Sequence, residues 1–409
     1  MITRRAALAG SVALMGAPSA SAQTQTGAQA GATVRWWYHF DDPKATPAAL
    51  IAGFEAQHPG IKIQAESIPW GGGGDYDTRL YTALIAGNGP DTAMVKFQNM
   101  PRLLEMDALL PIDAEIGAWA GRGDIAEDLW KLHRAPDGKQ YFLPLQYVIL
   151  YLYVRQDWFA QKKLAMPTDF DSFLAGAKAL TDAERWGFGM RGGSGGHDFW
   201  STFVLGNGAA IRKGGLVTPE ALAANKWFID LYRSEKVEPP SAPTDGFLQT
   251  INNMKAGRTA MTIHHIGSAN DMVAALGDAI TAIPVPRGAH GDGWATYGDG
   301  SNAVFSATKN KDAAWAWISY LSTGAANAAF AKLSAQLPVT SSSLKVWDGQ
   351  PRRFIEASEA SLPMARVLPA VTQTADFTRT VWPQTTQKAM LGQISPDDMM
   401  RTYEKLYFE

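Results

Sequence analysis

The chain has 409 residues, of which 46% are hydrophobic and 19% are charged, and it contains no cysteine. Its length exceeds the roughly 250–300 residues at which one hydrophobic core stops growing, so the sequence predicts two lobes or domains and excludes a disordered chain. The 37 Lys and Arg residues nearly balance the 39 Asp and Glu residues, which gives no basic surplus for nucleic-acid binding, and the lack of Cys excludes disulfides and thiolate metal sites.

The first thirty residues have the pattern of an export signal. Arg4 and Arg5 precede a short apolar run, and small residues up to Ala22 fit a cleavage site. The sequence therefore predicts a signal peptide over 1–22, a polar, disordered lead-in over 23–31 and a mature protein in the periplasm. The paired arginines favour twin-arginine export of the folded protein, with an ordinary secretory signal as the alternative.

Strand and helix patterns alternate through the first hundred residues. β-Branched and aromatic residues predict strands over 33–38, 61–68 and 92–97, and helical spacing predicts helices over 48–57 and 75–86. This alternation predicts a mainly parallel α/β sheet.

A second set of elements follows further along the chain. The patterns predict strands over 146–154 and 259–264, and helices over 169–180, 219–236, 310–321 and 399–406. Thr168, Thr218 and Asn310 are the expected N-caps of the first three of these helices. We find no internal repeat and no long linker, so several chain crossings should join the lobes.

Several short patterns match functional motifs whose context is missing. Residues 187–192 match G-x-G-x-x-G, yet Arg212 stands near the position where a dinucleotide site needs an acidic residue. Residues 192–196 match G-x-S-x-G, which four glycines around one serine produce easily in a flexible loop. His264 and His265 are adjacent, so in a strand they would point to opposite faces and could not chelate a metal together. We therefore expect no catalytic residue, no cofactor and no metal site.

Polar and aromatic residues recur at the ends of the predicted strands and in glycine-rich stretches. Ligands of open α/β sheets bind outside the carboxyl ends of the strands, where rings stack on a sugar and polar groups bond its hydroxyls. For each residue a solvated loop position is the alternative. The candidates for ligand binding are His39, Asp41, Lys96, Phe97, Gln146, Tyr147, His197, Trp200, His264, His265, Trp294 and Tyr297. Arg191 and Arg366 could meet an anionic group, although a surface position is the commoner outcome for arginine.

Seven stretches in fixed order resemble one protein family. They are FEAQHPGIKI (54–63), YDTRLYTALIAGNGPD (76–91), APDGKQYFLPL (135–145), YVILYLYVRQDWF (147–159), MPTDFDSFLAGAKALT (166–181), MKAGRTAMTI (254–263) and KNKDAAWAWISYL (309–321). Their order and spacing, more than any single stretch, resemble the family 1 extracellular solute-binding proteins, the carbohydrate receptors of bacterial ABC importers, whose best-known relative is maltose-binding protein.

The resemblance implies a two-lobed periplasmic binding protein fold of the α/β class. Each lobe would be a mainly parallel sheet flanked by helices, with hinge crossings between the lobes and the sugar held between them. The first lobe is expected over 32–145 and 261–306, and the second over 146–260 and 307–409.

The family's sugar contacts map to loops that carry the candidate residues, and we add Asp91 to that set. In many relatives a tryptophan follows the strand that corresponds to 259–263, whereas His264 stands there in this chain. This departure removes one stacking platform of a maltodextrin site, and Trp294 or Tyr297 could supply the missing face.

The expected function is therefore solute binding without catalysis. The protein would close on a sugar, oligosaccharide or sugar derivative and deliver it to the permease subunits of an ABC importer, as a monomer and without nucleic acid. The alternatives are an exported carbohydrate hydrolase or lyase, which would need a catalytic motif not found here, and an exported scaffold or adhesin, which would lack a small-molecule site.

Overall fold

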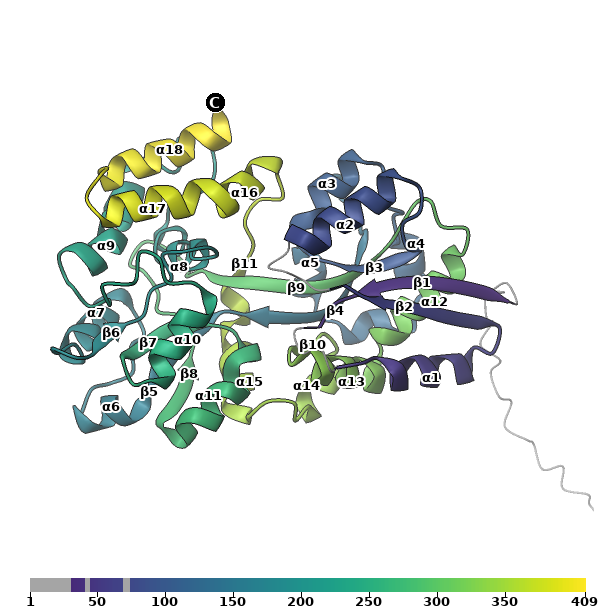
Figure 1. Cartoon of the computed structure of the whole chain (residues 1–409), viewed down its shortest axis with the longest axis horizontal. Coiled ribbons are helices and arrows are strands. Elements are labelled where there is room, and N and C mark those ends of the chain that lie inside the picture. The colour runs from purple at the N-terminus through teal and green to yellow at the C-terminus, as the bar shows by residue number, and fades with distance from the viewer. Residues whose placement is uncertain (1–30, 41–44, 69–73) are drawn as a thin grey trace, which may run out of the picture.

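The structure, a computed structural model, describes residues 31–40, 45–68 and 74–409. Its strands form two sheets, and each sheet is the centre of one lobe (Figure 1). The expected signal peptide, the lead-in up to Ala30 and the candidate residue Asp41 lie outside the described residues. Across the described ranges, no helix is long and apolar enough to cross a membrane.

The first lobe is built on a sheet whose strands are β1 (Ala32–Tyr38), β2 (Ile61–Ser67), β3 (Thr92–Val95), β4 (Phe142–Ile149), β9 (Ala295–Val304) and β10 (Leu337–Pro338). Their order is β10-β4-β9-β3-β1-β2, and β11 (Ala365–Arg366) pairs beside the start of β9. β1 is parallel to β2 and β3, whereas β9 is antiparallel to β3 and β4. The predicted strand-helix alternation therefore forms the β1, β2 and β3 part of the sheet.

The second lobe is built on β5 (Tyr151–Arg155), β6 (Trp186–Phe188), β7 (Thr259–His264) and β8 (Ile280–Ile283), in the order β6-β7-β5-β8. β6 and β7 are parallel, but β5 is antiparallel to both β7 and β8. The two-lobed α/β class is thus confirmed. The expectation of mainly parallel sheets needs correction. In the first lobe β9 is antiparallel to both of its neighbours β3 and β4, and in the second lobe β5 is antiparallel to both β7 and β8.

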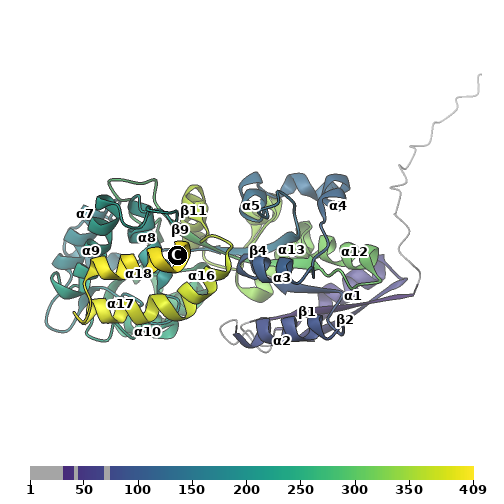
Figure 2. The same cartoon turned by 90° about the horizontal axis from the view of Figure 1, so that it is seen from above.

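Two long strands, β4 and β9, pair with each other and run from one lobe into the other (Figures 1 and 2). Their register extends from Phe142 opposite Ala303 to Ile149 opposite Tyr297. Leu150 then donates its N–H to the carbonyl of Thr296 at 3.0 Å, and β5 begins at the next residue. The single strand predicted over 146–154 is therefore two strands, because the chain changes sheets at this point.

Helices from both halves of the chain cover the first sheet (Figure 1). They are α1 (Ala48–Gln57), α2 (Gly74–Ile85), α3 (Met100–Glu105), α4 (Asp113–Ala118), α5 (Glu127–Leu132), α12 (Lys311–Leu321), α13 (Gly324–Ser334) and α14 (Ser341–Val346). Trp317 on α12 packs edge-on against Trp36 of β1, with ring centroids 5.2 Å apart. Asn310 makes no side-chain cap for α12, because its amide donates to the carbonyl of Thr33 at 3.1 Å.

The remaining helices lie in the second lobe (Figures 1 and 2). They are α6 (Gln156–Gln161), α7 (Phe170–Ala179), α8 (His197–Phe203), α9 (Pro219–Arg233), α10 (Phe247–Lys255), α11 (Ala269–Leu276), α15 (Arg352–Ser361), α16 (Thr372–Asp376), α17 (Trp382–Met390) and α18 (Pro396–Phe408). Thr218 caps α9 as predicted, by accepting from the N–H of Ala221 at 3.2 Å. α7 is capped by Asp169 in place of Thr168, because the Asp169 carboxylate accepts from the N–H of Ser172 at 2.8 Å.

The division of the chain between the lobes differs from the expected one in two segments. β7 and β8 pair with β5 in the second sheet, so residues 261–283 belong to the second lobe although we expected them in the first. α12, α13 and α14 contact β1, β4 and β10 of the first sheet, although we expected everything after 306 in the second lobe. Sequence patterns indicate whether a segment is a helix or a strand, but not which sheet it joins. After β8 the chain returns to the first lobe through β9.

Candidate functional site

The carboxyl ends of β1 and β3 carry the first group of candidate residues. His39 directly follows β1 and Lys96 directly follows β3, and because these strands are parallel both residues lie at the same edge of the sheet. His39 is buried, and its ring meets the ring of Tyr76 edge-on at 5.2 Å between centroids. Burial, and then the positive charge of Lys96, lowers the pKa of His39 to about 3. The imidazole is therefore neutral at pH 7 and offers one donor and one acceptor.

A buried carboxylate on α2 takes part in a contact between the lobes. Asp77 is 2% exposed and accepts a hydrogen bond at 3.4 Å from Arg379, which follows α16 in the second lobe. Burial raises the pKa of Asp77 to about 6, against the opposing effects of Asn99, Arg379 and Lys96. Asp77 was not among the sequence candidates, because a single acidic residue in a helical pattern is usually solvated.

The crossing strands carry buried polar atoms. Tyr147 stacks on Tyr297 with ring centroids 6.0 Å apart and planes inclined by 22°. Gln146 lies opposite Gly300, where a Cβ would come within 2.8 Å of the Gln146 amide nitrogen, so a larger residue there would displace the Gln146 side chain. The Gln146 Oε1 and the Tyr297 hydroxyl have no hydrogen-bond partner among the described residues. A buried polar atom left unpaired costs about 1–3 kcal/mol, so both atoms are suited to bond a polar ligand.

Asp299 on β9 fixes the loop that follows β3. Its carboxylate accepts hydrogen bonds from the N–H of Phe97 at 2.9 Å and the hydroxyl of Ser301 at 2.9 Å, and lies 3.2 Å from Nε2 of His133. Burial acts to raise the pKa of Asp299, but His133, Phe97 and Ser301 outweigh it and the pKa lies below its usual value. Asp299 therefore positions the loop that carries Lys96 and Phe97.

In the second lobe, the candidate residues His264 and His265 lie at the end of β7 and contact an aromatic side chain. The Phe247 ring, at the start of α10, lies 4.2 Å from the His264 ring and 5.6 Å from the His265 ring. His264 Nδ1 is 3.0 Å from the hydroxyl of Ser268, whereas its Nε2 has no hydrogen-bond partner within the described part of the chain. Phe247 is 37% exposed, which makes it an apolar face beside two imidazoles.

The two histidine rings lie side by side, with centroids 4.7 Å apart. The prediction that His264 and His265 point to opposite faces is wrong, because β7 ends at His264 and the chain turns into the short helix 266–268 directly afterwards. Over the ranges that the structure describes, no three His, Asp or Glu side chains are grouped so that they could hold a metal ion.

Burial lowers the pKa of both histidines. The pKa of His265 falls to about 4 through burial and then through the positive charges of Lys96 and Arg191. Burial, followed by His265 and Arg191, holds the pKa of His264 well below its usual value. Because Lys96 belongs to the first lobe and Arg191 to the second, His265 lies where charges from both lobes act.

His197, another candidate residue of the second lobe, lies at the start of α8, beside the start of α17. The His197 ring lies 6.4 Å from each of the Phe377 and Trp382 rings, and its Nε2 is 3.5 Å from the carboxylate of Asp198. Burial lowers the pKa of His197, while Asp198 opposes and Arg191 adds to this effect. Neither Nδ1 of His197 nor Nε1 of Trp382 has a partner in the described ranges.

Trp200 is the clearest correction to the predicted site. It is fully buried, its indole N–H donates to Asn225 at 2.9 Å, and its ring meets Tyr403 of α18 edge-on at 5.5 Å. α8 is covered by α9 and α18 on this side, so the residue belongs to the core of the second lobe and not to a ligand-binding face.

Trp294 is not brought together with the other candidates. It is half-buried before β9, lies against Gly206, and donates its indole N–H to the Thr296 hydroxyl at 3.3 Å. Among the described residues, no ring contact joins it to His264 or His265. Phe247, which contacts both histidine rings and is partly exposed, is therefore the better candidate for the expected stacking face.

Asp91 lies at the opposite end of β3 from Lys96. Its carboxylate accepts from the N–H of Arg35 at 2.8 Å and from the hydroxyl of Thr308, and it approaches the Asn310 amide at 3.5 Å. The five steps along the chain from Asp91 to Lys96 span roughly 16 Å in an extended strand. Asp91 therefore holds the start of β3, and its prediction as a ligand contact is corrected.

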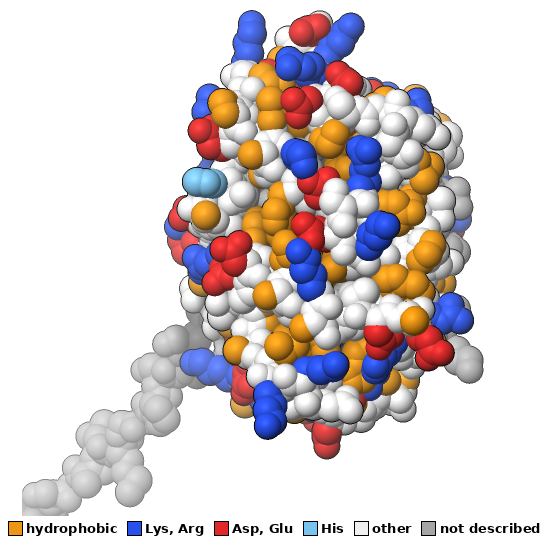
Figure 3. Space-filling model, turned by 90° about the vertical axis from the view of Figure 1, so that its left-hand side faces the viewer, with side chains coloured by type: hydrophobic (Ala, Val, Ile, Leu, Met, Phe, Trp, Pro, Cys, Tyr) orange, Lys and Arg blue, Asp and Glu red, His pale blue; other side chains and the backbone are white. Residues whose placement is uncertain are grey.

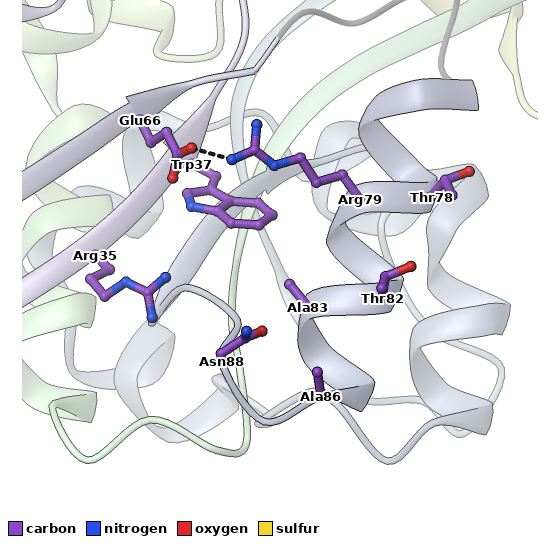
Figure 4. Close-up of a pocket in the computed structure, with 9 residues that line it drawn as sticks. All are labelled: Arg35, Trp37, Glu66, Thr78, Arg79, Thr82, Ala83, Ala86 and Asn88. Carbon is purple, nitrogen blue, oxygen red and sulfur yellow. Dashed lines mark hydrogen bonds and ion pairs between the residues drawn. The ribbon is translucent and has the colours of Figure 1, made fainter.

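A separate pocket of about 600 Å³ lies on the first lobe between β1, β2 and α2 (Figure 4). Arg79 pairs with Glu66 and lies over the Trp37 ring at 5.1 Å, and Arg35 and Asn88 line the other side. None of the predicted site residues lines this pocket.

Charge on the end face of the second lobe is mixed. Basic and acidic side chains are interspersed there with apolar ones (Figure 3). This face therefore lacks the basic stripe that nucleic-acid binding requires.

Comparison with known proteins identifies the family of this chain. The family model described as bacterial extracellular solute-binding protein matches residues 39–328. The chain belongs to this family. The family resemblance inferred from the seven sequence stretches is thereby confirmed.

Individual relatives agree with the family. A binding protein of Brucella abortus (strain 2308) is 27% identical to this solute-binding protein over an alignment of 369 residues that covers 85% of each chain. An ABC transporter solute-binding protein of Thermotoga lettingae, solved with α-D-tagatose, has a TM-score of 0.76 at 22% identity and covers 92% of this chain and 100% of its own. The sugar-binding protein MalE of Xanthomonas citri has a TM-score of 0.79 at 19% identity, over 91% and 95% of the two chains. These structures show the shared two-lobed fold.

Proposed function

We propose that this solute-binding protein captures a carbohydrate between its two lobes and delivers it to the membrane permease of an ABC importer. The main support is a set of buried polar atoms from the crossing strands and the second lobe that have no partner among the described residues: Gln146 Oε1, the Tyr297 hydroxyl and His264 Nε2. Amides, hydroxyls and neutral imidazoles donate and accept hydrogen bonds, as sugar hydroxyls do. Phe247 supplies an apolar face on which a sugar ring can stack.

Similarity to sugar-binding proteins adds support for a carbohydrate ligand. The Thermotoga lettingae protein was solved with α-D-tagatose, and the Xanthomonas citri protein is named a sugar-binding protein. Both share the fold of this chain, and this likeness supports a carbohydrate as the ligand.

The proposed mechanism is closure about β4 and β9. A ligand that bonds His39 on the first lobe and His264 on the second makes more contacts in the closed form than in the open one, so it shifts the population toward closure. No covalent bond changes in this process, and an importer would recognise the closed, loaded form.

The proposal is tested by screening neutral and acidic sugars for an increase in melting temperature, followed by titration calorimetry on those that respond. Small-angle scattering of the saturated protein should show a smaller radius of gyration than the protein alone. An unchanged profile would place the ligand on one lobe, and release of shorter products from an oligosaccharide would favour the hydrolase.

Gln146→Ala is the matching variant for the site, and it should weaken binding by roughly 5- to 15-fold if Oε1 bonds a ligand hydroxyl. Gln140→Ala is its control, because Gln140 also has a buried Oε1 without a partner among the described residues but lies before β4, where its amide donates to the carbonyl of Trp130 at 2.9 Å. Equal affinity losses in the two variants would mean that both act through general loosening of the lobe.

We further propose that the protein works in the periplasm and reaches it by the twin-arginine route. The paired residues Arg4 and Arg5 before an apolar run support this route. Replacing both with lysine should leave the protein in the cytoplasm, as measured by cell fractionation. Normal periplasmic accumulation of that variant would contradict the twin-arginine route but not the compartment.

A further inference from the structure

The glycine-rich loop between β6 and α8 is built around the side chain of Arg191. A Cβ on Gly195 would lie 1.9 Å from Nη2 of Arg191, and Gly195 has φ of +79°, so only glycine fits at this position. The Nε of Arg191 donates to the carbonyl of Ser194 at 2.6 Å. The glycine run that matches G-x-S-x-G therefore lets the loop backbone pack closely against the Arg191 side chain.

Arg191 has no ion-pair partner among the described residues. The carboxylate of Asp198, whose charge acts on Arg191, lies 3.5 Å from Nε2 of His197. Burial lowers the pKa of Arg191, and the charge of Asp198 opposes this only in part. Of the guanidinium nitrogens, Nε alone has a hydrogen-bond partner among the described residues, so Nη1 and Nη2 are left to bond something else.

The guanidinium belongs to the proposed ligand site. Its Cζ lies over the Phe247 ring at 5.4 Å, and that ring is the one packed against His264 and His265. Lys96 adds positive charge to the same place from the first lobe, because its charge acts on His265. Each lobe therefore brings one cation to the site, although the whole chain has a formal net charge of −2.

We infer that the solute carries an anionic group, a carboxylate, sulfonate or phosphate on the sugar, and that the Arg191 guanidinium binds it. This inference rests on the proposed carbohydrate function and specifies the class of carbohydrate. A guanidinium presents two parallel N–H donors that match two oxygens of such a group. The neutral imidazoles of His264 and His265 add donors beside it, and an anion held between Arg191 and Lys96 would attract both lobes.

The test compares matched pairs of probes on the full protein. The neutral members are glucose and galactose, and the acidic members are glucuronate, galacturonate, glucose 6-phosphate and 6-deoxy-6-sulfoglucose. At least one acid should bind roughly 10- to 150-fold more tightly than its neutral partner, which is the effect of a charged hydrogen bond. Its affinity should fall as salt is raised, while that of the neutral partner should not. The acidic probe that binds most tightly shows whether the anionic group of the solute is a carboxylate, a phosphate or a sulfonate.

Variants locate the effect at Arg191. Arg191→Met should bring the ratio of acid to neutral affinity close to one, and Arg191→Lys should keep part of it. Arg212→Met is the control, because Arg212 is exposed on the same lobe and its loss changes the net charge equally. If Arg191→Met does not fold, the salt dependence of the unmodified protein decides. Neutral sugars that bind as tightly as their acids, or an unchanged ratio in Arg191→Met, would overturn the anion site and leave the carbohydrate function intact. Failure of all neutral and acidic sugars to bind would overturn both.

Discussion

Trp200→Ala should destabilise the protein by about 3–5 kcal/mol, the usual cost of removing a buried indole from a core. The side chain is fully buried and packs against Phe377 and Tyr403 at 5.5 Å between ring centroids. Its loss also leaves the Oδ1 of buried Asn225 without the indole N–H. Unfolding in urea measures the change, and titration of the variant that remains folded should show ligand affinity close to that of the unmodified protein.

Trp294→Ala is the control for this measurement. Trp294 lies in the same lobe but is only half-buried, so its truncation should cost about 1–2 kcal/mol. Affinity should again change little, because the described contacts of Trp294 are to Gly206 and Thr296. A Trp294→Ala variant with unchanged stability and much weaker binding would restore Trp294 as the stacking platform and contradict its placement outside the site.

The fold was predictable from the sequence in its elements and less so in its assembly. A helix over 48–57 was predicted from apolar spacing, and the structure has a helix with the same bounds. The spacing was informative because it places Leu50 and Phe54 on the buried side of that helix. Membership of a sheet depends on contacts between distant residues, such as Tyr151 opposite His264. No local pattern encodes such pairing, which is why β7 and α12 were assigned to the wrong lobes.

The candidate site was predictable where it lies at strand ends and unpredictable elsewhere. His39, Lys96 and His264 were proposed from the sequence because they lie at the ends of predicted strands, and in the structure they directly follow β1 and β3 or end β7. Asp77 and Phe247 lie on helices, where the sequence shows an acidic residue and an aromatic residue of ordinary kind. Arg191 carried a usable signal, since four glycines in five residues beside an arginine indicate a backbone that must come close to a side chain.

Acidification should destabilise the folded protein, because His39, like His264, is buried with its pKa lowered. Its pKa is about 3 in the folded protein and about 6.5 in an unfolded chain, so between these values only the unfolded chain binds the proton. The contribution of His39 is therefore complete above pH 6.5 and is lost as the pH falls toward 3. At pH 4.5 this amounts to about 2–3 kcal/mol. His265, with a pKa of about 4, acts in the same direction.

Asp77 acts in the opposite direction and supplies the control. Its pKa is raised to about 6, so between about 3.8 and 6 the folded protein holds a proton that the unfolded chain releases. Its contribution to stability is therefore regained as the pH falls from 7 to 4.5, which offsets part of the histidine loss. His39→Gln should make the fall in unfolding free energy between pH 7.5 and 4.5 shallower, because a buried amide does not titrate. Asp77→Asn should make the same fall steeper. Urea unfolding at the two pH values measures both, and a pair of variants that shift the pH dependence in the same direction would show that these two groups do not titrate as their burial requires.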